Sequence, residues 1–249
     1  MRYRQVGSSG LTVSVVGLGC NSFGDTLDPS DVDTVVGAAI DSGITLFDTA
    51  DIYGGAPGQG EELLGAALGK RRDDVVLATK AGMDTQGLAG PAWECRGSRR
   101  YLHRAVEGSL RRLQTDHIDL LQLHEPDPIT PIDETLAALD DLVRSGKVRY
   151  IGSSNFTAWQ VVDADWTART SQLSRFVAAQ NPYSLLNRGM AFSMAGWRDA
   201  AAATISARAG REGAGKRREK KRKTARCLRS VFTEIVSFCN QVAFIVPEC

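Results

Sequence analysis

Short apolar runs alternate with longer segments of helical periodicity between residues 12 and 180. Each run is four to six residues long and continuously apolar or nearly so, which is typical of strands buried on both faces of a parallel sheet. The expected strands are residues 13–18, 44–47, 75–79, 118–123, 148–151 and 176–179. Repeated strand–helix units of this kind build either an open doubly wound sheet or a closed (β/α)8 barrel.

Start and stop signals delimit the helices between these strands. Ser30 and Ser98 mark two helix starts, and Pro131 suits the first position of a third helix because a backbone N–H is not needed there. Helix ends are expected at Gly43, Gly69 and Gly146.

The polar residues at the strand ends favour the barrel over the open sheet. Residues 17–19 read Gly-Leu-Gly and lack the third glycine of the dinucleotide-binding G-x-G-x-x-G pattern. In a barrel, the carboxyl ends of all strands open onto one mouth, which holds the active site. Successive strand ends here carry Asp48, Lys80, His124, Ser154 with Asn155, and Gln180. We therefore predict an α/β fold of the (β/α)8 barrel type, with these side chains gathered at one mouth.

Four of the residues at this mouth suit the donation of a proton. Tyr53 lies five residues beyond Asp48, close enough to lean over the same mouth. A phenol with a pKa near ~10 is a poor acid at neutral pH unless a cation stabilises its phenolate. Lys80 can supply that cation while Asp48 keeps the lysine protonated. His124 can hydrogen-bond a carbonyl oxygen, so the set fits general acid catalysis on an oxygen that gains negative charge.

A carbonyl reduction also needs a hydride, which no side chain supplies, so a nicotinamide cofactor is implied. Ser154, Asn155 and Gln180 offer donors and acceptors for its carboxamide.

Structural alternatives stay open for single residues. Asp48 could cap a helix or loop, Lys80 could be a solvated strand end, and Tyr53 could be a packed loop aromatic. Trp93 could line a substrate pocket or pack within its loop. His103 and His117 have no comparable neighbours in the pattern, so we expect both at the surface.

Charge separates the chain into two unlike parts. The whole chain of 249 residues has a formal net charge of +1 and is 43% hydrophobic, which permits a sizeable core. Residues 208–229 carry 11 basic and two acidic side chains, whereas residues 1–207 carry 19 basic and 25 acidic ones. The charge run at 216–223 could be a nuclear-import signal or a nucleic-acid arm. It has no interleaved aromatic residues, so we expect no nucleic-acid partner.

Cysteine usage and hydropathy indicate a cytoplasmic protein. The five cysteines are odd in number and widely scattered, so neither a disulfide framework nor a metal site is expected. The N-terminus lacks the apolar core of a secretory signal. The apolar stretch 231–246 is interrupted by polar residues and is shorter than the ~20 residues of a membrane span.

Residues 3 to about 187 resemble the aldo-keto reductases. The early motifs are most similar to those of the branch that includes potassium-channel β-subunits and bacterial and plant oxidoreductases. The motifs that carry the resemblance are Gly7-x-Ser9-Gly10-Leu11-x-Val13-Ser14, Gly17-Leu18-Gly19, Phe47-Asp48-Thr49-Ala50-Asp51-x-Tyr53-Gly54, Glu61-Glu62-Leu63-Leu64-Gly65, Ala78-Thr79-Lys80, Ser109-Leu110-x-Arg112-Leu113-x-Thr115-Asp116-x-Ile118-Asp119-Leu120, Leu123-His124-x-Pro126-Asp127, Gly146-Lys147-Val148-Arg149-Tyr150-Ile151-Gly152-x-Ser154-Asn155-Phe156 and Gln180-Asn181-x-Tyr183.

This resemblance implies a (β/α)8 barrel that reduces aldehydes and ketones, its small-molecule substrates, with NADPH or, less often, NADH. It implies Tyr53 as the general acid, Lys80 as the modulator of its pKa, and Asp48 as the partner of the lysine and a neighbour of the nicotinamide ribose. It further implies that His124 orients the substrate. The same resemblance assigns the carboxamide to Ser154, Asn155 and Gln180. The alternative within this fold is a non-catalytic nucleotide-binding or regulatory subunit.

The resemblance ends near residue 188. Residues 190–210 are alanine-rich and residues 216–223 are a charge run, so neither segment predicts a buried strand, while residues 231–246 could supply one strand or short helix. We therefore expect an incomplete barrel of about six βα units at 1–188. The tail at 189–249 is outside the family pattern, and its basic stretch at 208–229 has a composition compatible with disorder. Loss of strands seven and eight would impair cofactor binding, and we hypothesise that the tail comes from an altered reading frame, an unspliced intron or a divergent splice product.

Overall fold

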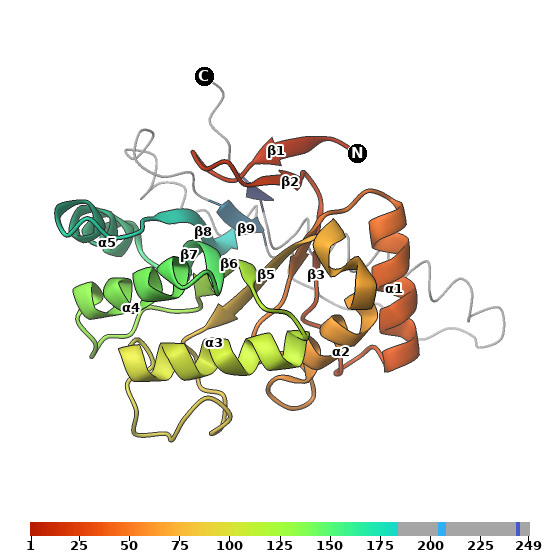
Figure 1. Cartoon of the computed structure of the whole chain (residues 1–249), viewed down its shortest axis with the longest axis horizontal. Coiled ribbons are helices and arrows are strands. Elements are labelled where there is room, and N and C mark those ends of the chain that lie inside the picture. The colour runs from red at the N-terminus through yellow and green to blue at the C-terminus, as the bar shows by residue number, and fades with distance from the viewer. Residues whose placement is uncertain (184–203, 208–242, 245–249) are drawn as a thin grey trace.

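The computed structural model describes residues 1–183, 204–207 and 243–244, and Figure 1 shows their arrangement. Six parallel strands form a half-barrel sheet in which each strand pairs with the next along the chain. These strands are β3 (Gly17–Gly19), β4 (Leu46–Asp48), β5 (Val76–Ala81), β6 (Ile118–Leu123), β7 (Val148–Ser154) and β8 (Phe176–Tyr183). The predicted α/β class and the truncated barrel of about six βα units are confirmed.

Helices connect the strands and cover the outer face of the sheet (Figure 1). They are α1 (Pro29–Asp41), α2 (Gln59–Leu68), the 3-10 helix η1 (Gly69–Asp74), α3 (Arg99–Leu113), α4 (Ile132–Arg144) and α5 (Ala158–Thr170). Two buried apolar clusters join helices to strands, one including Leu102, Leu121 and Leu139 and the other Phe47 and Leu64. None of the helices in the described ranges is long and apolar enough to cross a bilayer.

The predicted helix signals hold in part. Ser98 caps α3 by accepting a hydrogen bond from the backbone N–H of Tyr101. Asp28, rather than Ser30, caps α1, because its carboxylate is placed to accept from two free backbone N–H groups of the first turn. Pro131 is the residue before α4 rather than its first residue. The predicted stops Gly43, Gly69 and Gly146 all have positive φ, the backbone region in which glycine ends helices.

The first predicted strand, 13–18, is two strands in the structure. A bend at residues 15 and 16 separates β2 (Thr12–Ser14) from β3. Strand β2 pairs antiparallel with β1 (Tyr3–Gln5) in an N-terminal hairpin. The sequence pattern does not reveal this bend, because residues 13–18 form one nearly continuous apolar run.

The N-terminal hairpin closes the amino end of the half-barrel. Its apolar side chains, among them Val6 and Val13, pack in one buried cluster with side chains from the inner face of four strands. The strand residues in this floor cluster are Leu46, Ala78, Leu120 and Ala178. The inner face of the sheet is therefore apolar and filled at its amino end.

Two short strands follow the half-barrel. Strand β9 (Thr204–Ala207) runs parallel to β8, with Gln180 opposite Thr204, and β10 (Ala243–Phe244) runs antiparallel to β9. The sequence predicts no strand at 204–207, and this expectation is wrong, since the free edge of β8 can recruit even a short, weakly apolar segment through backbone hydrogen bonds. Strand β10 falls within the apolar stretch 231–246, for which a strand or short helix is expected.

The rest of the tail at 189–249 lies outside the described residues. This includes all of the basic stretch at 208–229, and with it the charge run at 216–223. Among the described strands, the sheet runs in linear order from β10 through β3 and does not close on itself.

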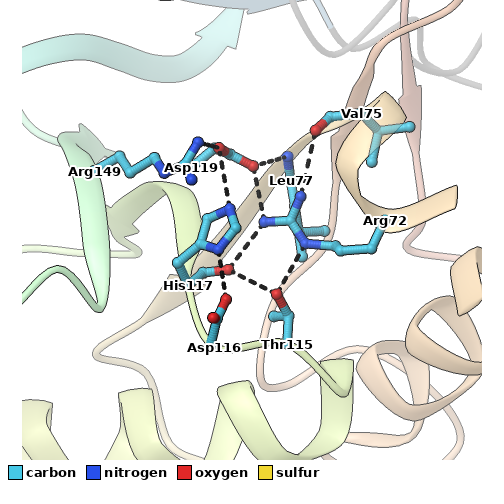
Figure 2. A network of polar contacts seen from close by, with 8 residues as sticks. All are labelled: Arg72, Val75, Leu77, Thr115, Asp116, His117, Asp119 and Arg149. Carbon is cyan, nitrogen blue, oxygen red and sulfur yellow. Dashed lines mark hydrogen bonds and ion pairs between the residues drawn. The ribbon is translucent and has the colours of Figure 1, made fainter. Parts of the chain in front are cut away.

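A network of polar contacts joins the amino ends of β5, β6 and β7, opposite to the mouth (Figure 2). The guanidinium of Arg72 donates to a carboxylate oxygen of Asp119 at 2.9 Å and to the hydroxyl of Thr115 at 3.1 Å. The same Asp119 oxygen accepts the backbone N–H of Leu77 at 2.9 Å. His117, which we expect at the surface, is instead largely enclosed here, with a side chain 14% exposed. In barrels of this type, the amino end serves stability rather than chemistry.

Replacing Asp119 tests the stabilising role of this network. In Asp119→Asn, the amide oxygen can still accept the N–H of Leu77, but Arg72 loses its charged partner, so we expect the free energy of unfolding to fall by about 1–3 kcal/mol. Asp116→Asn is the matched control, because the Asp116 side chain is 96% exposed, and its effect should be much smaller than that of Asp119→Asn. Urea unfolding of both variants measures the difference. Equal effects would argue against the role of Asp119.

Candidate active site

The residues predicted to share one mouth come together at the carboxyl ends of the strands. Asp48 ends β4, Lys80 lies near the end of β5, and His124 directly follows β6. Ser154 ends β7 and lies opposite Gln180 of β8 in the parallel register. The strand-end pattern in the sequence therefore predicts the position of each of these side chains.

Asp48 and Lys80 form a buried ion pair at the centre of this mouth. The ammonium Nζ of Lys80 lies 2.7 Å from Oδ1 of Asp48 and also donates to the backbone carbonyl of Thr49 at 3.0 Å. The two side chains are 10% and 2% exposed, respectively. Burial lowers the pKa of Lys80, but Asp48 and the phenol of Tyr53 outweigh burial, so the pKa lies above its ordinary value. Lys80 is therefore a cation at neutral pH.

Gln122 is a member of this site that the sequence analysis does not single out. Its amide donates to Oδ1 of Asp48 at 3.4 Å and to the side-chain oxygen of Gln180 at 3.0 Å. The amide of Gln180 in turn donates to Oδ2 of Asp48 at 3.1 Å. A usable signal exists, because Gln122 stands two residues before His124 and successive side chains of a strand alternate between its faces.

Tyr53 lies in the loop between β4 and α2, beside both Lys80 and His124. The Nζ of Lys80 is 5.2 Å from the centre of the tyrosine ring. The rings of Tyr53 and His124 meet edge to face, with centres 5.9 Å apart and an interplanar angle of 83°. Burial raises the pKa of Tyr53 above its ordinary value of 10.0, and Asp48 adds to this, while Lys80 opposes it. The expected effect of Lys80 is present but smaller than that of burial, so the phenol keeps its proton.

His124 is a neutral imidazole in this setting. Burial and, second, the charge of Lys80 lower its pKa from 6.5 to about 3. Its Nδ1 is buried and has no hydrogen-bond partner among the described residues. A neutral imidazole has one nitrogen that donates and one that accepts, so the ring can hydrogen-bond a carbonyl group placed at the mouth.

Ser154 and Asn155 continue the site beyond β7. Asn155 has a positive φ of 58°, and its amide donates to the backbone carbonyl of His124 at 2.9 Å and to the hydroxyl of Ser154 at 3.2 Å. These contacts fix both residues beside His124. Their grip on a carboxamide, shared with Gln180, stays a prediction.

The pocket candidate Trp93 and the expected surface residue His103 lie apart from these contacts. Trp93 is 75% exposed, and the guanidinium of Arg100 lies over its ring at 6.0 Å. His103 is on α3 with a side chain 39% exposed. The described contacts link neither residue to Asp48, Lys80 or Tyr53.

Comparison with family models gives one match. Residues 15–222 match the model described as the aldo/keto reductase family. This match covers more than half of the chain, and it runs past Tyr183, where the last motif quoted above ends.

Named relatives give the same picture. The chain is 43% identical over 194 residues to an uncharacterized oxidoreductase, YrpG, of Bacillus subtilis, covering 76% of this chain and 60% of that protein. It is 39% identical over 202 residues to the aldo-keto reductase YhdN of Bacillus subtilis, covering 76% and 56%. It is 35% identical over 192 residues to a probable voltage-gated potassium channel subunit beta of Oryza sativa subsp. japonica, covering 76% and 57%. The aligned part of the chain thus spans less than two thirds of each of these relatives.

Proposed function

Because the chain belongs to the aldo/keto reductase family, we propose that it is an oxidoreductase that reduces aldehyde and ketone carbonyls to alcohols, with NADPH as the preferred hydride donor and NADH as the alternative. The observation that carries the proposal is the meeting of Tyr53, Lys80, Asp48 and His124 at one mouth. We also propose a small-molecule carbonyl substrate and a cytoplasmic location.

Tyr53 acts as the general acid in this proposal. Its phenol is protonated at neutral pH, and the Lys80 ammonium beside it stabilises the phenolate that forms when the proton leaves. Asp48 holds Lys80 at 2.7 Å and keeps it charged. Gln122 and Gln180 hold Asp48 in turn, so the lysine has a fixed direction of approach to the phenol.

His124 orients the carbonyl group. Its pKa of about 3 keeps the ring neutral, so it can contribute a hydrogen bond without adding a second cation beside Lys80. The edge-to-face contact with Tyr53 places the imidazole next to the proton donor. A carbonyl oxygen within hydrogen-bond distance of both the Tyr53 hydroxyl and the His124 imidazole would receive its proton from Tyr53.

The described residues fit the nicotinamide end of a dinucleotide cofactor. The observation is the pair of amide side chains at this mouth, that of Asn155 held by the backbone carbonyl of His124 at 2.9 Å and that of Gln180 held by Asp48 at 3.1 Å. Ser154, Asn155 and Gln180 would hold the carboxamide, and Asp48 would border the ribose. The cofactor, when bound, supplies the hydride. Loss of the family's later strands would weaken its binding and the activity of this chain.

Turnover of a generic aldehyde tests the proposal. With 4-nitrobenzaldehyde as substrate, we expect the full chain to consume NADPH, followed by the loss of its absorbance, and to form the alcohol. The kcat/KM should be higher with NADPH than with NADH. No turnover with either cofactor, in a sample that shows a cooperative thermal transition, would contradict the proposed activity.

The second candidate is a non-catalytic nucleotide-binding or regulatory subunit. The similarity to a probable potassium channel subunit beta favours it. Binding of NADPH to the purified chain without turnover of any aldehyde tested would support this candidate over the reductase.

A further inference from the structure

We propose that Glu61 is a positioning residue that holds the Tyr53 loop against the Lys80 strand through a bridge of side chains on the outer face of the sheet. This inference rests on the proposed function, since it concerns the geometry of the proton donor. The Glu61 bridge consists of Thr79, Glu61 and Arg112, from β5, α2 and α3, respectively.

The position of Tyr53, the proposed general acid, relative to Lys80 depends on two separate elements. Lys80 belongs to β5, whereas Tyr53 belongs to the loop before α2. The backbone carbonyl of Tyr53 accepts a hydrogen bond from the N–H of Gly60 at 2.9 Å. A Cβ at Gly60 would meet the backbone oxygen and the Cβ of Tyr53 at 3.1 Å. The first turn of α2 is thus in direct contact with Tyr53, so whatever fixes this turn also fixes the tyrosine.

Glu61 ties this turn of α2 to the strand of Lys80. The Thr79 hydroxyl donates to Oε1 of Glu61 at 2.6 Å, and both side chains are fully buried. Thr79 directly precedes Lys80, and adjacent residues of a strand point to opposite faces of the sheet. The lysine therefore faces the mouth while its neighbour is anchored behind the sheet to the helix that carries the tyrosine loop.

Arg112 completes the bridge from α3. Its Nε lies 2.8 Å and its terminal nitrogen 2.7 Å from Oε2 of Glu61, so the guanidinium binds this oxygen through two of its nitrogens. The helices touch closely here, because a Cβ at Gly65 of α2 would lie 2.6 Å from the backbone carbonyl oxygen of Arg112. The carboxylate of Glu61 is therefore held on both oxygens by two different elements.

Asp51 is a second buried carboxyl group close to the Glu61 bridge. Its side chain is fully buried, and neither carboxyl oxygen has a partner among the described residues. Burial and repulsion by Glu61 raise the pKa of Asp51 well above its ordinary value, while Arg112 and Lys80 oppose this only in part. Burial thus favours the neutral form of Asp51, and Arg112 forms its ion pair with Glu61.

A stabilising role alone explains this arrangement poorly. A buried ion pair often stabilises a fold no better than apolar residues of the same volume, because removing the two charges from water is costly. Directional contacts to Glu61 from a strand and a second helix instead fix its position and, through α2, that of Tyr53. Displacement of a catalytic group by about 1 Å can reduce catalysis by as much as ~10²-fold.

Substitutions in the full chain test the inference. Thr79→Val removes the hydroxyl and keeps the size and branching of the side chain, whereas Thr79→Ser keeps the hydroxyl. Glu61→Gln removes the charge, and Glu62→Gln is its matched control on the exposed side of the same turn. We expect Thr79→Val to lower kcat about tenfold with little change in the KM for the aldehyde, since the proton donor and not the binding surface is displaced. Thr79→Ser and Glu62→Gln should retain the kcat of the parent chain.

A spectroscopic readout separates this inference from the proposed activity. With isotope-labelled tyrosine, the NMR resonance of the Tyr53 hydroxyl-bearing ring carbon is assigned by its absence in Tyr53→Phe. We expect the chemical shift of this resonance to change in Thr79→Val and Glu61→Gln and to remain that of the parent chain in Glu62→Gln and Thr79→Ser. If Thr79→Val and Glu61→Gln lower only thermal stability and leave both kcat and this resonance unchanged, the positioning role is wrong. If the parent chain turns over no aldehyde, the proposed function fails and the resonance alone decides the inference.

Discussion

Tyr53→Phe is expected to lower kcat for aldehyde reduction by ~10²–10⁴-fold, the usual contribution of general acid catalysis. The substitution removes the hydroxyl and keeps the ring that contacts His124 edge to face. The KM for the aldehyde should change far less than kcat, because the proton is transferred only in the transition state. Steady-state measurement of NADPH consumption over a range of aldehyde concentrations gives both constants.

A second tyrosine provides the control for this experiment. Tyr3 is 51% exposed, and its hydroxyl donates to the backbone carbonyl of Gly43, far from the residues of the mouth. Tyr3→Phe should therefore keep the kcat of the parent chain. If Tyr53→Phe also kept it, Tyr53 would not be the general acid.

Lys80→Met is expected to abolish measurable turnover and to lower the free energy of unfolding by about 3–5 kcal/mol, the usual cost of leaving one partner of a buried ion pair uncompensated. Asp48 would remain enclosed without its cation. Thermal unfolding and circular dichroism measure the stability, and the NADPH assay measures the activity.

The pH dependence of this variant has a defined sign. In the parent chain, the raised pKa of Lys80 means that its contribution to stability is complete below the ordinary value of 10.5 and is lost as the pH rises through the folded-state pKa. In Lys80→Met this contribution is absent, so the deficit relative to the parent chain should stay constant from acidic to neutral pH and should shrink only as the pH rises through the folded-state pKa of Lys80.

The double variant Lys80→Met with Asp48→Asn separates stability from chemistry. Removing both charges should recover much of the lost stability, because no uncompensated charge stays buried. It should not recover turnover, since nothing then stabilises the phenolate of Tyr53. Recovery of activity would show that Lys80 has no role in proton donation.

The site could be predicted from the sequence to the extent that it depends on strand ends. Asp48, Lys80, His124, Ser154 and Gln180 each stand where an apolar run stops, and parallel strands bring such positions to one edge. The alternation of side chains along a strand places Gln122 on the same face as His124, so the sequence pattern can also identify Gln122 as a site residue. The family assignment follows from the ordered set of motifs, which the family model matches independently.

Other features depend on contacts between segments that a linear pattern does not pair. Nothing near Glu61 in the sequence identifies Arg112 as its partner, because these residues meet only when α2 and α3 pack together. The enclosed position of His117 likewise requires Arg72 and Asp119 to be brought together from two chain segments. The hairpin of β1 and β2 is not predicted, because the nearly continuous apolar run 13–18 gives no sign of the bend at residues 15 and 16.

The floor cluster beneath the N-terminal hairpin lies very close to the site residues, on the same four strands. Leu46, Ala78, Leu120 and Ala178 belong to the floor, and each is followed two positions later on the same strand by Asp48, Lys80, Gln122 and Gln180, respectively. Two residues along a strand span only about 6.6 Å. The polar site residues thus form a single layer directly above the apolar floor cluster. Substitutions in this one layer could therefore change the reaction while the packing of the floor cluster stays unchanged.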